Sequence, residues 1–220
     1  MKNAVVLGLS LALLAGCVQE SSRTLPIQKV ESAQVVYNGS RLPVSIGKFN
    51  NRSSFMRGVF ADSASEDRLG SQAQTILTAH LQQSQRFSVL DRTLASETKQ
   101  EAQLSGQAQQ LRGAKFILTG DVTEFGRKEV GDQQLFGILG RGRTQVAYSK
   151  VTLNIVNTLT SEVVYSTQGA GEYSLSQREI IGFGSTASYD ATLNGKVLEL
   201  AIRDAINNLV TDLDGGRWKP

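Results

Sequence analysis

Apolar and polar residues alternate in several short stretches of this chain, and the segments between them carry apolar residues at helical spacing. Alternation predicts strands at about residues 42–46, 87–92 and 116–118. The apolar residues of 67–83 fall on one helix face, which predicts an amphipathic helix, and the polar stretch at 94–111 predicts a second. Strands and helices that alternate in this order favour a domain in which helices pack on a sheet.

Two glycine-rich segments follow, at about residues 126–150 and 166–190, each flanked by strand-like stretches. Each has about 25 residues, enough for a hairpin of two membrane-spanning strands, because a transmembrane strand needs about 9 to 11 residues. Four strands cannot close a barrel by themselves, and lipid does not tolerate an open strand edge. A spanning interpretation therefore requires several copies of the chain in a ring.

A different interpretation is that the two segments are long periplasmic loops in contact with water. Charged residues interrupt the alternation, which is unfavourable on the lipid side of a barrel strand. These residues include Glu129, Asp132, Arg141 and Arg143. The apolar positions that would serve as hairpin residues are Leu135, Phe136, Ile138, Leu139, Ile181 and Phe183. Periodicity alone favours the loops.

The last predicted helix begins after Asp190, a residue type that caps helix N-termini, and runs to about residue 210. Its apolar residues cover more than one narrow stripe. Such a helix needs cover on two sides. The predicted fold class of residues 42–220 is α+β, with strands packed against helices and two β-hairpin insertions.

The first residues have the form of an export signal. Lys2 precedes an apolar run at residues 4–14, and a small-residue site ends at Cys17, the only cysteine. The run is too short to span a bilayer, so residues 1–16 are predicted to be a cleaved lipoprotein signal peptide. Cys17 then becomes the first residue and carries the acyl chains, palmitate among them. The alternatives are an uncleaved signal anchor and a chance cysteine in a core helix.

The residues after the lipidated cysteine predict a tether. Val18 stands where an aspartate would retain a lipoprotein at the inner membrane, which favours sorting to the outer membrane. Residues 17–41 are polar and lack periodicity, so they are expected to form a flexible coil with an end-to-end distance of roughly 27 Å. A tether of this length lets the folded part stand off the membrane or lie against a neighbouring subunit.

Composition excludes several classes of function. The net charge is +3 and the basic residues are scattered, so no nucleic acid is expected as a partner. His80, the only histidine, shares a helix face with apolar neighbours, which favours a packing role. One histidine and one lipidated cysteine provide neither a nucleophile pair nor a zinc site. The glycine cluster at 137–142 lacks the lysine of a phosphate-binding loop. We therefore expect no enzyme activity, no metal and no cofactor.

Several segments carry a family resemblance. They lie at residues 87–92, 119–126, 135–138, 144–145, 151–163, 184–190 and 214–218. Among them are Phe-Ser-Val-Leu-Asp-Arg at 87–92, Val-Thr-Leu-Asn-Ile-Val-Asn at 151–157 and Asp-Gly-Gly-Arg-Trp at 214–218. Together they resemble the curli-secretion channel lipoproteins, the CsgG family, over about residues 42–218, and the lipoprotein signal agrees with this resemblance.

The resemblance implies an outer-membrane lipoprotein whose periplasmic α/β domain assembles into a homo-oligomeric ring, with the hairpins forming one shared β-barrel. It implies export of unfolded polypeptide in curli assembly, with periplasmic accessory proteins and outer-membrane lipid as further partners. In that family the loop before the first long helix lines the constriction. Here the loop begins at Phe55, and an ungapped alignment places Phe60 at the narrow-point tyrosine. Ala64 and Ser65 take the positions of an asparagine and a phenylalanine.

Two other functions fit the same residues. A structural or accessory lipoprotein with this fold and no pore would serve exopolysaccharide, flagellar or other cell-envelope assembly. An activator of an envelope enzyme would bind its partner with the α/β face.

Overall fold

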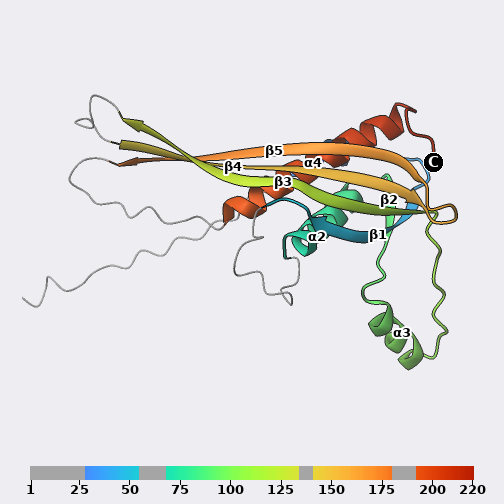
Figure 1. Cartoon of the computed structure of the whole chain (residues 1–220). Helices are drawn as coiled ribbons and strands as arrows, with labels where there is room; N and C mark the ends of the chain where they lie inside the picture. The colour runs from blue at the N-terminus through green and yellow to red at the C-terminus, as the bar shows by residue number, and fades with distance from the viewer. Residues whose placement is uncertain (1–27, 55–67, 134–140, 180–191) are drawn as a thin grey trace, which may run out of the picture.

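The computed structural model describes residues 28–54, 68–133, 141–179 and 192–220 (Figure 1). The described strands are β1 (Leu42–Asn51), β2 (Phe87–Leu90), β3 (Phe116–Gln133), β4 (Arg141–Asn157) and β5 (Val163–Glu179). The helices are the 3-10 turn η2 (Glu31–Gln34) and the α-helices α2 (Arg68–Gln83), α3 (Ala95–Leu104) and α4 (Thr192–Asp214). These elements confirm an α+β fold.

The described strands form one mixed sheet in the order β2-β1-β3-β4-β5. β1 lies parallel to both β2 and β3, whereas β3, β4 and β5 are antiparallel to one another. Helices α2 and α4 pack against each other and against the same face of the sheet (Figure 1). The opposite face carries polar side chains. Two of them form a hydrogen bond, in which Ser166 Oγ donates to Asn154 Oδ1 at 2.8 Å.

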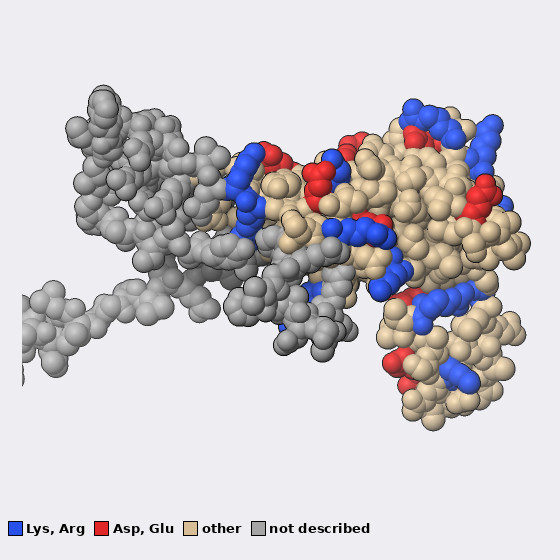
Figure 2. Space-filling model, viewed as in Figure 1, with Lys and Arg blue, Asp and Glu red and all other residues tan. Residues whose placement is uncertain are grey.

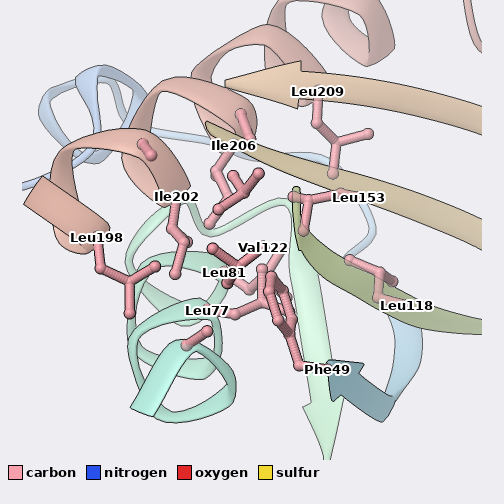
Figure 3. Packing of buried hydrophobic residues seen from close by; sticks show 14 of the residues in the cluster. Phe49, Leu77, Leu81, Leu118, Val122, Leu153, Leu198, Ile202, Ile206 and Leu209 are labelled. Carbon is pink, nitrogen blue, oxygen red and sulfur yellow. The ribbon is translucent and has the colours of Figure 1, made fainter. Parts of the chain in front are cut away.

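The core lies between this pair of helices and the sheet. Figure 3 shows Leu77 and Leu81 of α2 and Ile202 of α4 directed toward Leu118 and Leu153 of the sheet. All five side chains are fully buried. The predicted amphipathic helix at 67–83 and the two-sided cover of the last helix are thereby confirmed, since α4 contacts β4, β5 and α2.

Helix α3 is shorter than the stretch 94–111 that the sequence indicated. It ends at Leu104 because Gly106 adopts a left-handed conformation with φ +71, which stops an α-helix. No residue of α3 is buried, and the helix stands apart from the sheet on two extended connections (Figure 1).

The sequence predicted a tether over residues 17–41. In the structure, part of this segment, around Val30, packs on the domain. Val30 is fully buried in the core cluster, and Ala33 packs against the same cluster. The backbone N–H of Glu31 donates to Asn207 Oδ1 of α4 at 3.1 Å. Apolar contacts with the core and hydrogen bonds with α4 therefore fasten this segment to the domain.

Strands β3 and β4 run without interruption through the segment 126–150 that the sequence marked as an insertion. Their pairing extends to Gln133 opposite Arg141, so the described parts of this segment continue the sheet as two long antiparallel strands, and residues 134–140 between them lie outside the described residues. The second marked segment, 166–190, is a single strand up to Glu179, and residues 180–191 lie outside the described part. None of the helices in the described ranges is long and apolar enough to cross a membrane.

Candidate functional site

The end of the sheet that extends past its helices is the part of the structure best placed to interact with other molecules. β3, β4 and β5 project beyond α2 and β1 in Figure 1. Their backbones pair with one another along this whole length, from Phe116–Asn157 to Gln133–Arg141 on one side of β4 and from Val156–Val163 to Arg141–Glu179 on the other. The site therefore consists of strand edges and not of a pocket with converging side chains.

The pairing of β3 with β1 ends before the extended part of β3. The last pair between these strands is Asn51 with Val122, and the backbone N–H groups of Arg52 and Ser53 then both donate to the carbonyl of Val122, at 2.9 and 3.1 Å. Ser53 Oγ also donates to Asn51 Oδ1 at 2.6 Å, which closes the turn. Within the described residues no strand pairs with this side of β3 over residues 123–133.

The edge of β5 is divided into a capped part and an open part. The backbone N–H of Ala170 donates to Asp204 Oδ2 of α4 at 3.0 Å, and Asn208 Nδ2 donates to the carbonyl of Gln168 at 3.0 Å. These two side chains occupy the backbone positions that an added strand would use. Over residues 171–179 no strand of the described part pairs with the side of β5 that faces away from β4.

Two glycines let α4 approach β5 closely enough to make these caps. A Cβ atom on Gly169 would lie 2.2 Å from both Ala201 O and Ala205 N. A Cβ atom on Gly171 would lie 2.8 Å from Ala201 N. Because both conflicts involve helix backbone, only glycine permits this distance between helix and strand.

The first turns of α4 hold the base of the extended strands in place. Arg127 of β3 donates to Asn194 Oδ1 through Nε at 2.9 Å and Nη2 at 2.7 Å. The Nζ of Lys196 lies 4.8 Å from the ring centroid of Tyr173 on β5, a cation–π contact. The extended part therefore starts from a fixed direction relative to the helices.

A polar groove of about 400 Å³ lies beside the capped edge. Its walls come from the segment before β1, from β5 and from α4. The lining residues are Lys29, Glu31, Ala170, Gly171, Glu172, Leu200, Arg203, Asp204 and Asn207. Both signs of charge are present in it, and Figure 2 likewise shows charges of both signs interspersed over the visible face of the described part. Neither surface has the uniformly positive charge typical of a nucleic-acid partner.

His80 lies in the interface between α2 and α4 with 2 % of its surface exposed. Burial lowers the pKa of His80 below its usual value, and Arg203 acts in the same direction. The hydrogen bond with Gln83 and the carboxylate of Glu199, whose Oε1 lies 3.9 Å from Nε2, act in the opposite direction. This environment agrees with a packing role. Within the described ranges no cluster of His, Cys, Asp and Glu could hold a metal ion.

The site residues that the sequence singled out all lie outside the described residues. They are the lipidation residue Cys17, the constriction-loop residues Phe55, Phe60, Ala64 and Ser65, and the hairpin residues Leu135, Phe136, Ile138, Leu139, Ile181 and Phe183. Sequence reasoning missed Asp204 and Asn208. The available signal was a pair of polar residues four apart on a helix that is otherwise apolar on two sides.

The whole folded range matches one protein family. A family model described as the curli production assembly/transport component CsgG covers residues 27–219. The chain belongs to the CsgG family. This confirms the assignment made from the sequence, and the match begins at residue 27, next to the segment that packs on α4.

This CsgG-family chain is similar to a protein of known sequence and to solved structures. A protein of Neisseria meningitidis serogroup B, provisionally named lipoprotein NMB1126/NMB1164, is 61% identical over 220 residues, which is 100% of this chain and 98% of the relative. The solved PelC dodecamer from Paraburkholderia phytofirmans is 14% identical, with a TM-score of 0.37, and the overlay covers 78% of this chain and 93% of that one. The lipoprotein GNA1162 from Neisseria meningitidis is 12% identical, with a TM-score of 0.37 and coverage of 78% and 99%.

Proposed function

We propose that this chain is an outer-membrane lipoprotein that assembles into a homo-oligomeric ring and exports unfolded polypeptide, as in curli assembly. The extended parts of β3, β4 and β5 contribute to one β-barrel shared by all subunits. The function is passage through a pore and involves no catalytic step and no cofactor. The family assignment and the length of the extended strands support this proposal.

The length of the extended strands carries the proposal. β3 continues past the end of β1 for residues 123–133, and β5 continues past its capped part for residues 171–179. A strand that crosses a bilayer needs about 9 to 11 residues, which is the length of these two stretches, and their first residues, up to Arg127 and Tyr173, still contact α4. The domain built by α2 and α4 then remains on the periplasmic side.

The need for edge partners in lipid accounts for the ring. Backbone groups that lack a partner in lipid cost several kcal/mol each, so three strands that cross a bilayer need neighbouring strands on both sides. Neighbouring copies satisfy these groups when their extended strands join edge to edge, and closed barrels leave no free edge. Imaging of the ring is the measurement that gives the number of subunits.

The remaining parts of the proposal rest on the family resemblance and on the relative's name. Cys17 carries the lipid, and Phe60 repeats around the ring as an apolar collar at the narrow point. Such a collar lets an unfolded chain pass and restricts water and folded proteins. Periplasmic accessory proteins bias the direction of transport.

Conductance across a planar bilayer tests the pore. The purified lipoprotein is expected to run as a large ring in detergent and to conduct ions, and Phe60→Ala is expected to raise the single-channel conductance. Leu159→Ala is the matched control, because Leu159 lies in the turn between β4 and β5 and is 91% exposed. A monomer in detergent without conductance would exclude the proposal.

A second candidate is an accessory lipoprotein with this fold and no pore. The polarity of the sheet face opposite the helices favours it, because Lys128 and Glu172 are exposed near the start of the extended strands. A lipid-facing surface would be apolar there. Protease added outside intact cells separates the two functions: cleavage within residues 126–150 supports the pore, and protection supports the accessory role.

A further inference from the structure

The segment before β1 makes contacts that a passive tether would not make. Val30 has 0% of its surface exposed. The Glu31 N–H donates to Asn207 Oδ1 at 3.1 Å, and the Arg203 guanidinium donates to Gln28 Oε1. In contrast, Val36 is 81% exposed only six positions further along. The contacts with α4 are therefore confined to a short stretch of the chain.

We propose that residues 28–34 form a clamp that fastens the lipid tether to α4, so that the membrane holds the domain beside the α4–β5 edge and not at the start of β1. The position of the membrane depends on the lipidation of Cys17, which is part of the proposed function. The contacts of the clamp belong to the folded domain and do not depend on the lipid. Lys29 and Glu31 also form one wall of the polar groove whose other walls are β5 and α4.

The clamp shortens the free part of the tether. Ten residues, 18–27, stand between Cys17 and the clamp, against 24 residues, 18–41, for a tether that reached to the start of β1. The membrane surface is then held close to the clamp.

The position of the clamp along β5 matches the point where the extended strands begin. The capped residue Ala170 and the clamp residue Glu31 line the same groove, and β5 continues from Ala170 to Glu179 over about 30 Å. The part of β5 that extends beyond α4 begins after Tyr173, which Lys196 of α4 still contacts. We therefore expect the clamp to hold the membrane on the side of the domain from which the extended strands leave.

Limited trypsin digestion of the full lipoprotein in detergent tests the clamp. Trypsin can cut after Arg23, ahead of the clamp in the sequence, and after Lys29, inside the clamp. The wild-type chain is expected to be cut after Arg23 and protected after Lys29, as read from the mass of the resistant domain. Val30→Asp places a charge in the core and is expected to raise the rate of cleavage after Lys29 at least tenfold. Val36→Asp, the same change at an exposed valine, is expected to leave that rate unchanged.

A milder variant covers the case in which Val30→Asp prevents folding. Asn207→Ala removes the acceptor for the Glu31 N–H without adding a charge, and it is expected to raise cleavage after Lys29 several-fold while Trp218 fluorescence stays that of the folded domain. Equal cleavage after Arg23 and Lys29 in the wild-type chain would overturn the clamp, as would equal rates in the two valine variants. Incorporation of labelled palmitate reports the lipid anchor separately, so failure of the anchor and failure of the clamp are distinguishable.

Discussion

Trp218 stacks on Tyr165, with ring centroids 5.6 Å apart and ring planes inclined by 29°. The same indole meets Phe116 edge-on at 5.7 Å, so it joins β3 to β5 beyond the end of α4. Asp212 holds this arrangement, because it accepts a hydrogen bond from the Tyr165 hydroxyl and pairs with Arg217. The end of the last helix is thereby fixed to the sheet at the opposite end from the extended strands.

Replacement of this indole is expected to destabilise the domain strongly. Trp218 is 5% exposed, and Trp→Ala substitutions at buried positions cost about 3 to 5 kcal/mol. Trp218→Ala is therefore expected to lower the free energy of unfolding in urea by about 3 kcal/mol. Circular dichroism is the suitable probe, because the chain has no other tryptophan. Trp218→Phe keeps an aromatic ring on Tyr165 and should lose clearly less, and equal losses for both variants would contradict the stacking argument.

The buried His80 predicts a pH dependence of stability. Its pKa in the folded chain lies below the value of 6.5 for a free histidine, because burial disfavours the charged ring. In the pH range between these two values the unfolded chain binds more protons, so stability is present above about pH 6.5 and falls as the pH drops through the folded pKa. The free energy of unfolding is expected to be smaller at pH 5 than at pH 7.5.

His80→Gln isolates this effect, because glutamine occupies similar space and does not titrate. The variant should show a flatter profile between pH 5 and pH 7.5 in the same urea experiments. A decline at low pH that is as steep in His80→Gln as in the parent chain would assign the effect to carboxylates instead.

Periodicity predicted the elements whose buried face follows from the spacing of apolar residues within the element itself. The apolar residues of α2 and α4 recur at helical spacing, and the observed bounds of α2 differ from the predicted helix by one residue. The clamp had no such signal, because Val30 is a single apolar residue in a polar stretch and its burial depends on α4, far away in the sequence. Helix α3 was predicted too long because Gly106 was not recognised as its C-terminal stop.

The strand edges could not be predicted for a related reason. Asp204 and Asn208 act through the backbone of β5, and a side chain that caps a distant strand has the same local pattern as any exposed polar residue on a helix. Periodicity alone favoured loops over 126–150 because charged residues interrupt the alternation, whereas β3 and β4 are paired strands over 126–133 and 141–150, which only the register of the sheet shows.

The close contact between β5 and α4 predicts that alanine is not tolerated at its glycines. A methyl group at Gly169 would lie 2.2 Å from backbone atoms of α4, so the helix must move away. Gly169→Ala is expected to lower stability by about 1 to 3 kcal/mol, as overpacking of a close contact does. Gly113→Ala is the control, because no atom lies within 4 Å of its Cβ position. Unchanged melting temperatures for both variants would refute the role of the contact.

Removal of the caps on β5 predicts uncontrolled strand pairing. Asp204 and Asn208 satisfy Ala170 N–H and Gln168 C=O, and without them the edge of β5 offers a longer template to other chains. The double variant Asp204→Ala, Asn208→Ala should cost about 1 kcal/mol per lost hydrogen bond and convert a discrete species in sedimentation velocity into a broad range of larger ones. The single variant Asp204→Asn keeps an acceptor for the Ala170 N–H and leaves Asn208 in place, so it should sediment as a discrete species, unlike the double variant. A sharp boundary that persists in the double variant would show that the caps do not limit pairing.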